Sequence, residues 1–172
     1  MSKIENNIVD VSKRIDQSAA KYGRDPSEIL LLAVSKTRSV EHIRQAMAAG
    51  LTHFAENYLQ EALEKIVELE GENLCWHFIG PLQSNKTRNA AENFSWVHSV
   101  DRLKIAQRLS EQRPAELGPL NICLQINIDN EATKSGFSAE QALAAAEEII
   151  QLPNLHLRGL MAIPQSQQTE EK

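Results

Sequence analysis

Two kinds of apolar pattern alternate along the chain. Apolar residues recur at helical spacing in the first segment, and this spacing predicts a leading helix over residues 4–22. Gly23 and Pro26 follow as stop signals. Residues 29–34 are then apolar at every position, which is typical of a strand that is covered on both faces of a parallel sheet.

The same alternation continues to the end of the chain. From residue 28 onward it predicts βα units, with further strands at 52–55, 74–79, 96–100, 121–128 and 155–163. Caps mark the helices between them: Ser39, Asp101, and the capping box of Ser138 and Gln141. Six strands separated by helices indicate an α/β fold whose sheet is parallel, with right-handed crossovers.

Two architectures fit this order. An open doubly wound sheet can be complete with six strands, whereas a (β/α)8 TIM barrel needs eight strands and usually about 200–250 residues. Neither GxGxxG nor GxxxxGK[ST] follows the first strand. Polar residues instead follow the ends of five strands: Lys36, Glu56, Asn57, Gln83, Ser84, Ser99, Asp101 and Asn127. Such a distribution is typical of a barrel's active face, so we predict a barrel-type single domain over 1–172.

Composition narrows the function classes. The chain has 172 residues and a formal net charge of −5, which argues against a general nucleic-acid binder. No secretory signal and no apolar stretch of membrane-spanning length occur, so we expect a cytoplasmic protein that does not enter membranes. Cys75 and Cys123 lie in apolar runs and are expected to be buried thiols without a disulfide.

Lys36 is the residue that most clearly suggests chemistry. By two-residue alternation it shares a face with Leu30, Leu32 and Val34, so we expect it to point inward. Desolvation disfavours the charged form of a lysine, and an uncharged amine is what a Schiff base with an aldehyde requires. The alternative is a lysine whose charged end merely extends into the loop after the strand.

Histidines occur in or near three strands. His77, between Trp76 and Phe78, reads as a buried histidine satisfied by hydrogen bonds rather than as a base. His53 and His98 are placed similarly, but no pair has local ligand spacing, so no metal site is predicted.

Four motifs occur in order along essentially the whole chain: Leu32–Thr37 (LAVSKT), Glu56–Tyr58 followed by Gln60 and Glu61, Trp76–Lys86 (WHFIGPLQSNK) and Gly159–Pro164 (GLMAIP). Together they closely resemble the pyridoxal phosphate homeostasis protein family, also called the YggS-like or proline synthetase co-transcribed family. The resemblance implies a barrel like the N-terminal domain of alanine racemase. It implies pyridoxal 5′-phosphate (PLP) held as a Schiff base by Lys36, with Asn57 beside the cofactor ring and His77 and Met161 on strands that line the pocket.

The resemblance also implies a role. The family buffers intracellular PLP and delivers it to PLP-dependent apo-enzymes, without an established catalytic turnover, so no catalytic residue is predicted. Two features depart from the family. Ala55 stands where the motif usually has glycine. Family members also continue for about two more βα units, which carry the phosphate-binding segments, so we expect only six of the eight barrel strands here. We therefore predict weak or absent PLP affinity for the 172-residue form and full affinity for a complete chain.

Two other functions stay open. A PLP-dependent amino-acid racemase needs a base on each face of the reacting carbon. Lys36 can serve one face, but Tyr22 ends the leading helix and Tyr58 opens another helix, so neither is a clear second base. The other hypothesis is a doubly wound ligand-binding or interaction domain with no cofactor, in which Lys36 has no special role.

Overall fold

The computed structural model describes residues 2–128 and 135–164. The chain divides into two compact units, residues 1–76 and 77–172. Residues 1, 129–134 and 165–172 lie outside the described part of the chain.

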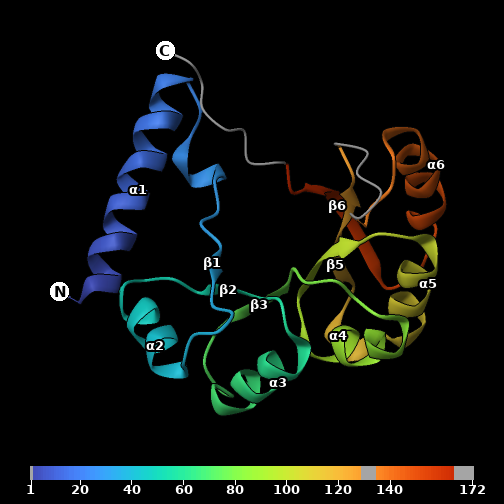
Figure 1. Ribbon diagram of the computed structural model, residues 1–172, viewed down its shortest axis with the longest axis horizontal. Coiled ribbons are helices and arrows are strands. Elements are labelled where there is room, and N and C mark those ends of the chain that lie inside the picture. Colours follow the sequence, from blue (N-terminus) through green and yellow to red (C-terminus); the bar gives the residue numbers. More distant parts are fainter. Residues whose placement is uncertain (1, 129–134, 165–172) are drawn as a thin grey trace. The chain divides into compact units, whose positions relative to one another are not determined.

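The first unit contains three helices and two short parallel strands (Figure 1). Their bounds are α1 Lys3–Lys21, β1 Ala33–Val34, α2 Val40–Ala48, β2 His53–Glu56 and α3 Leu59–Glu68. α1 begins with a capping box in which Ser2 and Glu5 satisfy each other's backbone N–H groups. β1 pairs with β2 so that Ala33 lies opposite Phe54 and Val34 opposite Ala55. Burial of apolar side chains from α2, β2 and α3 supplies the core of this unit.

The second unit carries the remaining strands, each parallel to the next in the chain. Their bounds, with those of the helices between them, are β3 Cys75–Phe78, α4 Thr87–Asn93, β4 Trp96–Val100, α5 Leu103–Gln112, β5 Leu120–Ile126, α6 Ala139–Ile149 and β6 Leu155–Ala162. β3 begins in the last residues of the first unit and pairs with β4 through His77 and Phe78. α4, α5 and α6 lie along one side of these strands (Figure 1). The prediction of an α/β fold with six parallel strands is therefore confirmed.

Arg113, directly after α5, fixes the turn into β5. Its guanidinium donates to four backbone carbonyls, those of Gly118 at 2.7 Å, Ala91 at 2.7 Å, Phe94 at 2.8 Å and Leu117 at 3.0 Å. Burial lowers the pKa of this guanidinium from its usual value. One side chain thus satisfies carbonyls at the C-terminal end of α4 and in the segment before β5.

Gly136 lies where the chain returns to the end of β5. Phe137 N–H donates to the Gln125 carbonyl at 2.9 Å, and Asn127 N–H donates to the Phe137 carbonyl at 3.0 Å. A Cβ atom on Gly136 would lie 2.8 Å from the Asn127 nitrogen, and its φ is +134°. The close crossing and the positive φ both require glycine at this position.

The first strand is shorter than predicted. The first strand was expected over 29–34, but only Ala33 and Val34 pair with β2. Leu30 and Val34 are 55% and 50% exposed, so the expected cover on both faces is absent from this part of the described structure.

Asp101 was expected to cap α5, and this expectation is wrong. Arg102 is the N-cap residue, without a side-chain capping bond. The Asp101 carboxylate instead accepts a hydrogen bond from Arg102 Nη1 at 2.7 Å, because the neighbouring cation competes for it. The capping box of Ser138 and Gln141 on α6 is confirmed. Among the described residues, no helix combines the length and the apolar composition needed to cross a membrane.

Candidate functional site

Lys36 lies in a turn directly after β1. Ser35 continues the pairing with β2, since its N–H donates to the Ala55 carbonyl at 2.9 Å. Ser35 is buried and Lys36 is exposed. The expectation that Lys36 is desolvated is therefore wrong, because Leu30 and Val34, its apolar neighbours on that face, are themselves open to solvent. Within residues 2–128 and 135–164, the Lys36 amine has no hydrogen-bond or ion-pair partner.

Thr37 gives this turn its unusual backbone. Its φ is +61°, in the left-handed region that a β-branched residue rarely adopts. Such a conformation costs on the order of 1–3 kcal/mol and persists only where the surroundings impose it. Here the Thr37 N–H donates to Glu61 Oε1 at 2.6 Å, and Arg38 N–H donates to the Ser35 carbonyl at 3.0 Å.

A buried lysine in α3 organises the same region. Lys65 is 5% exposed, and its Nζ donates to Glu61 Oε1 at 2.6 Å, Glu56 Oε1 at 2.7 Å and the Ser35 carbonyl at 2.8 Å. Ser35 Oγ donates to the same Glu56 oxygen at 2.6 Å. The three ammonium hydrogens are therefore all directed at oxygen atoms around the Lys36 turn.

The two carboxylates of this cluster have different surroundings. The hydrogen bond from Lys65 is the main cause that holds the pKa of Glu61 below its usual 4.5, with a further contribution from the Thr37 N–H. Glu56 is fully buried at the end of β2, and within the described part of the chain its Oε2 atom has no hydrogen-bond partner. Glu56 therefore depends on Oε1 alone for compensation of its buried charge.

Asn57 follows β2 as Lys36 follows β1. Because the two strands are parallel and paired in register, the structure brings Lys36 and Asn57 to the same edge of the first unit. Asn57 is half-buried. The other two predicted cofactor residues, His77 and Met161, belong to the second unit.

His77 lies in a group of rings on β3 and β4. It is 1% exposed, its Nδ1 is hydrogen-bonded to His98 Nε2 at 2.9 Å, and its ring stacks on Trp96 with centroids 5.5 Å apart. Burial lowers the pKa of His98 below 6.5. The Arg158 guanidinium lies 5.7 Å from the centre of the Trp96 ring. The expectation that His77 is buried and satisfied by hydrogen bonds is confirmed.

Met161 and the cysteines complete the predicted residues. Met161 is half-buried on β6, opposite Gln125 of β5. Cys123 is buried, and burial raises the pKa of its thiol, partly opposed by the charge of Arg158. Cys75 is only half-buried, so its expected burial is incomplete, and the described residues contain no disulfide.

Comparison with known proteins places the chain in a family. Residues 3–172 match the family model of the alanine racemase N-terminal domain. The chain is 63% identical over 165 residues to a pyridoxal phosphate homeostasis protein of Pseudomonas aeruginosa, covering 96% of this chain and 72% of that one. It is 52% identical over 167 residues to the protein of the same name from Escherichia coli, covering 95% of this chain and 71% of that one.

The chain belongs to the pyridoxal phosphate homeostasis protein family. Among solved structures it is similar to PipY of Synechococcus elongatus in two states. The form without PLP matches with a TM-score of 0.77 at 38% identity, covering 90% of this chain and 73% of that one. The form with PLP bound matches with a TM-score of 0.72 at 37% identity, covering 87% and 70%. An alanine racemase of Clostridium difficile, 18% identical with a TM-score of 0.63 over 78% of this chain and 35% of that one, shares the fold alone.

Membership in the pyridoxal phosphate homeostasis protein family confirms the resemblance drawn from the four motifs. The fold is that of the alanine racemase N-terminal domain. The assignments of Lys36, Asn57, His77 and Met161 to the cofactor stay predictions.

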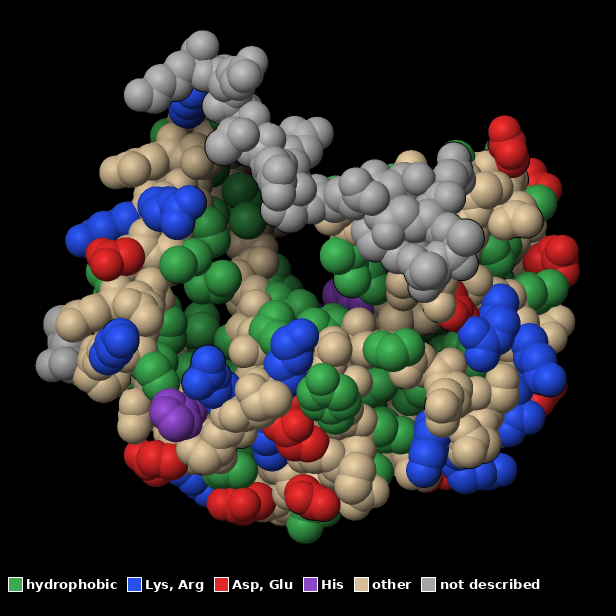
Figure 2. All heavy atoms as spheres, viewed as in Figure 1, with side chains coloured by type: hydrophobic (Ala, Val, Ile, Leu, Met, Phe, Trp, Pro, Cys, Tyr) green, Lys and Arg blue, Asp and Glu red, His purple; other side chains and the backbone are tan. Residues whose placement is uncertain are grey.

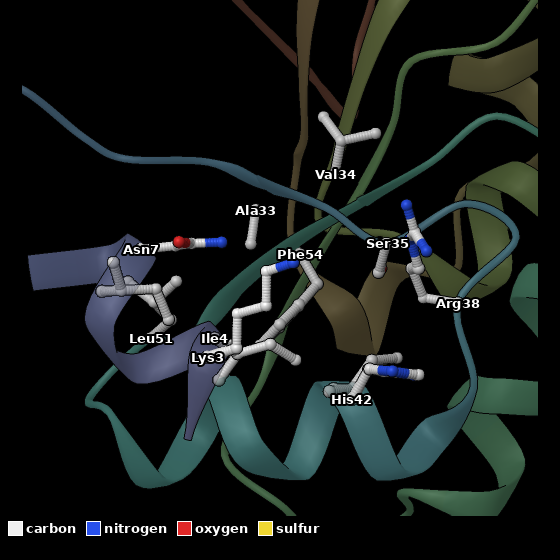
Figure 3. Close-up of a pocket in the computed structure, with 13 residues that line it drawn as sticks. Lys3, Ile4, Asn7, Ala33, Val34, Ser35, Arg38, His42, Leu51 and Phe54 are labelled. Carbon is white, nitrogen blue, oxygen red and sulfur yellow. The ribbon is translucent and has the colours of Figure 1, made fainter. Parts of the chain in front are cut away.

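A cavity of about 570 Å³ lies beside β1 in the first unit (Figure 3). Lys3, Arg38 and His42 contribute its basic side chains, and the remaining lining is mostly apolar. Figure 3 shows Ala33 and Ser35 on one side of the strand and Val34 on the other. Val34 and Ser35 line this cavity, whereas Lys36, the next residue along the chain, does not.

Basic side chains gather over α4 and α5 in Figure 2. Several already have partners: Arg88 pairs with Glu92 at 3.5 Å, Arg102 with Asp101 at 2.7 Å, and Arg108 Nε donates to the Ser84 carbonyl at 2.8 Å. These contacts join three of the cations to oxygen atoms within the second unit.

Sequence reasoning missed Lys65. A lysine inside an amphipathic helix is usually a surface charge, and only its spacing of four residues from Glu61 indicated a pair. No local pattern shows that this pair is buried against the Lys36 turn. Its other partners lie far from Lys65 along the chain: Ser35 is 30 residues away and Glu56 is nine residues away.

Proposed function

We propose that this chain binds PLP through a Schiff base on Lys36 and takes part in intracellular PLP homeostasis. The observation that carries the proposal is the Lys36 turn: an exposed amine without a partner among the described residues, on a backbone held from both sides. An amine that is committed to an ion pair would have to break it before reacting, and Lys36 has none to break.

The residues present fit the cofactor at this point. When bound, PLP supplies an aldehyde carbon with which a lysine amine condenses to a carbon–nitrogen double bond with loss of one water. Lys36 supplies the amine, and the buried cluster behind it leaves the amine itself uncommitted. Lys65 is less suited, since its three donors are already used and its side chain is 7% exposed.

Asn57, His77 and Met161 are proposed as further cofactor-binding residues. Asn57 is supported by its place at the same strand edge as Lys36. His77 and Met161 are supported by their positions within the motifs that the family shares, on β3 and β6. We further propose that residues 1–172 act as a single PLP-binding domain in the cytoplasm.

We propose a carrier or regulator of PLP without turnover of its own, with PLP-dependent apo-enzymes as recipients. The relatives are named homeostasis proteins, and PipY has been solved with PLP bound. Nothing in the described structure favours a racemase, since Tyr22 and Tyr58 are both strongly exposed, at 73% and 55%, at helix ends.

The test is to mix the purified chain with PLP, record the visible absorption of a Schiff base, and reduce it with borohydride before peptide mass spectrometry. Lys36→Ala should abolish both the band and the modified peptide. Lys104→Ala, at an exposed lysine of α5, is the matched control and should change neither. A modified peptide that persists in Lys36→Ala, or no band either in this chain or in one extended to the length of its relatives, would refute the proposal. Alanine racemisation by the PLP-loaded chain would refute the absence of turnover.

A further inference from the structure

The backbone on both sides of Lys36 is held by one buried ionic cluster. On the N-terminal side, the Ser35 carbonyl accepts from Lys65 Nζ at 2.8 Å. On the C-terminal side, the Thr37 N–H donates to Glu61 Oε1 at 2.6 Å. Lys65 and Glu61 are joined to each other at 2.6 Å, so the two contacts form one continuous bridge across the turn.

From this geometry we propose that Lys65, Glu56 and Glu61 are positioning residues for Lys36. Lys65 and Glu61 hold the Ser35–Thr37 turn from either side, and Glu56 anchors Lys65 to the end of β2. None of the three touches the Lys36 amine in the described structure, so they act through the backbone. The inference rests on the proposed attachment of PLP at Lys36.

The left-handed Thr37 shows what the cluster does. A threonine at φ +61° returns to an ordinary conformation when nothing holds it, and that rotation would re-aim the preceding residue. The bond from Thr37 N–H to Glu61 opposes this rotation, and Lys65 keeps Glu61 charged and in place. The cluster thereby fixes the direction of the Lys36 side chain before any ligand arrives.

Glu61→Ala is the informative variant, because Glu61 is partly exposed and its loss leaves Lys65 bound to Glu56 and the Ser35 carbonyl. Glu64→Ala is the matched control. Glu64 is exposed on the same helix, and Gln60 donates to it at 3.2 Å, outside the cluster. A second variant, Thr37→Gly in the Glu61→Ala background, removes the strain because glycine adopts positive φ without penalty.

Two readouts are measured on each form. The first is hydrogen exchange of the Thr37 amide in the chain without PLP. The second is the rate of Schiff-base formation with PLP. We expect Glu61→Ala to speed the exchange and to slow Schiff-base formation by about tenfold, within the range that misplacing a reacting group costs. Glu64→Ala should match the parent, and Thr37→Gly should restore most of the lost rate.

The outcomes separate this inference from the function on which it rests. If Glu61→Ala forms the Schiff base as fast as Glu64→Ala does, the positioning role is overturned while attachment at Lys36 stands. A double variant no faster than Glu61→Ala would overturn the part assigned to Thr37. If neither the parent nor its form extended to the length of its relatives forms a Schiff base, the proposed function fails, and the exchange of the Thr37 amide still shows whether the cluster holds the turn.

Discussion

Lys65 places a positive charge in the core of the first unit, with two carboxylates around it. Its side chain is 7% exposed, and that of Glu56 is fully buried. Two charges withdrawn from water stabilise a fold little as a pair, but removing one of them leaves the other without compensation. Glu56 is the more sensitive partner, since its Oε2 atom has no hydrogen bond within the described residues.

Lys65→Met should therefore lower the free energy of unfolding by about 3–5 kcal/mol, because it leaves Glu56 buried and unpaired. Urea unfolding followed by circular dichroism measures the loss. Lys104→Met, at an exposed lysine, is the control and should stay within about 0.5 kcal/mol of the parent. A loss no larger than that of the control would show that Glu56 finds another partner.

Arg113 is a second residue whose role lies in its geometry. Arg113→Lys keeps the charge but cannot reproduce a planar fork directed at four carbonyls. We expect a loss of about 2–4 kcal/mol in the free energy of unfolding, since several buried carbonyls are left without donors. Thermal denaturation of parent and variant measures it. If lysine substitutes without loss, charge rather than the hydrogen-bonding fork is what matters.

At the scale of elements, the contact between α3 and the turn after β1 depends on pH through Glu61. The folded-state pKa of Glu61 lies below its usual 4.5, chiefly through the bond from Lys65. The unfolded chain therefore binds the proton more readily, and the stability that the Glu61 charge contributes is present above pH 4.5 and lost as pH falls through the lower folded value.

The free energy of unfolding should therefore depend on pH, and the substitution Glu61→Gln should alter that dependence. Glu61→Gln removes the titrating group but keeps its size. We expect the gap in stability between parent and Glu61→Gln to be greatest near about pH 6 and to shrink toward about pH 3, because protonation removes the advantage of the parent. Urea titrations across that range measure the gap. A constant gap would mean that Glu61 acts by packing alone.

Elements also show where sequence patterns suffice. The strand at 96–100 and the Ser138 capping box were predictable because their signals are local. The strand is a short segment rich in aromatic and β-branched residues, and the capping box is two side chains at a spacing of three. The predicted length of the strand at 29–34 was wrong, since an apolar run shows that residues prefer burial but not which strand pairs with them. The prediction that Asp101 caps α5 was wrong for a similar reason, because its carboxylate accepts a hydrogen bond from the neighbouring Arg102 instead of from the helix N-terminus.

For the whole molecule, the predicted single domain can be tested by cooperativity. Lys65 belongs to the first compact unit and Arg113 to the second. If the chain unfolds as one domain, Lys65→Met and Arg113→Lys should each shift the same single transition in differential scanning calorimetry. Agreement of the calorimetric and van't Hoff enthalpies is the criterion. Two transitions, each moved by only one of the variants, would show two independent domains.

Fold class and family were both accessible from the sequence, because alternating βα units and four ordered motifs extend along the chain. The site was accessible only in part. Lys36 stands out by following an apolar run, yet its exposure and the cluster behind it depend on contacts between α3, β1 and β2. Such contacts between distant segments leave no periodic trace in a sequence.

Gly136 has a consequence for how this protein can change. Its crossing with the end of β5 admits no side chain, and its φ excludes most residues regardless of size. In a saturation library selected only for folding, this codon should remain glycine while neighbouring codons diversify. The requirement owes nothing to PLP, so strict retention of a residue in descendants of this sequence need not mark a ligand.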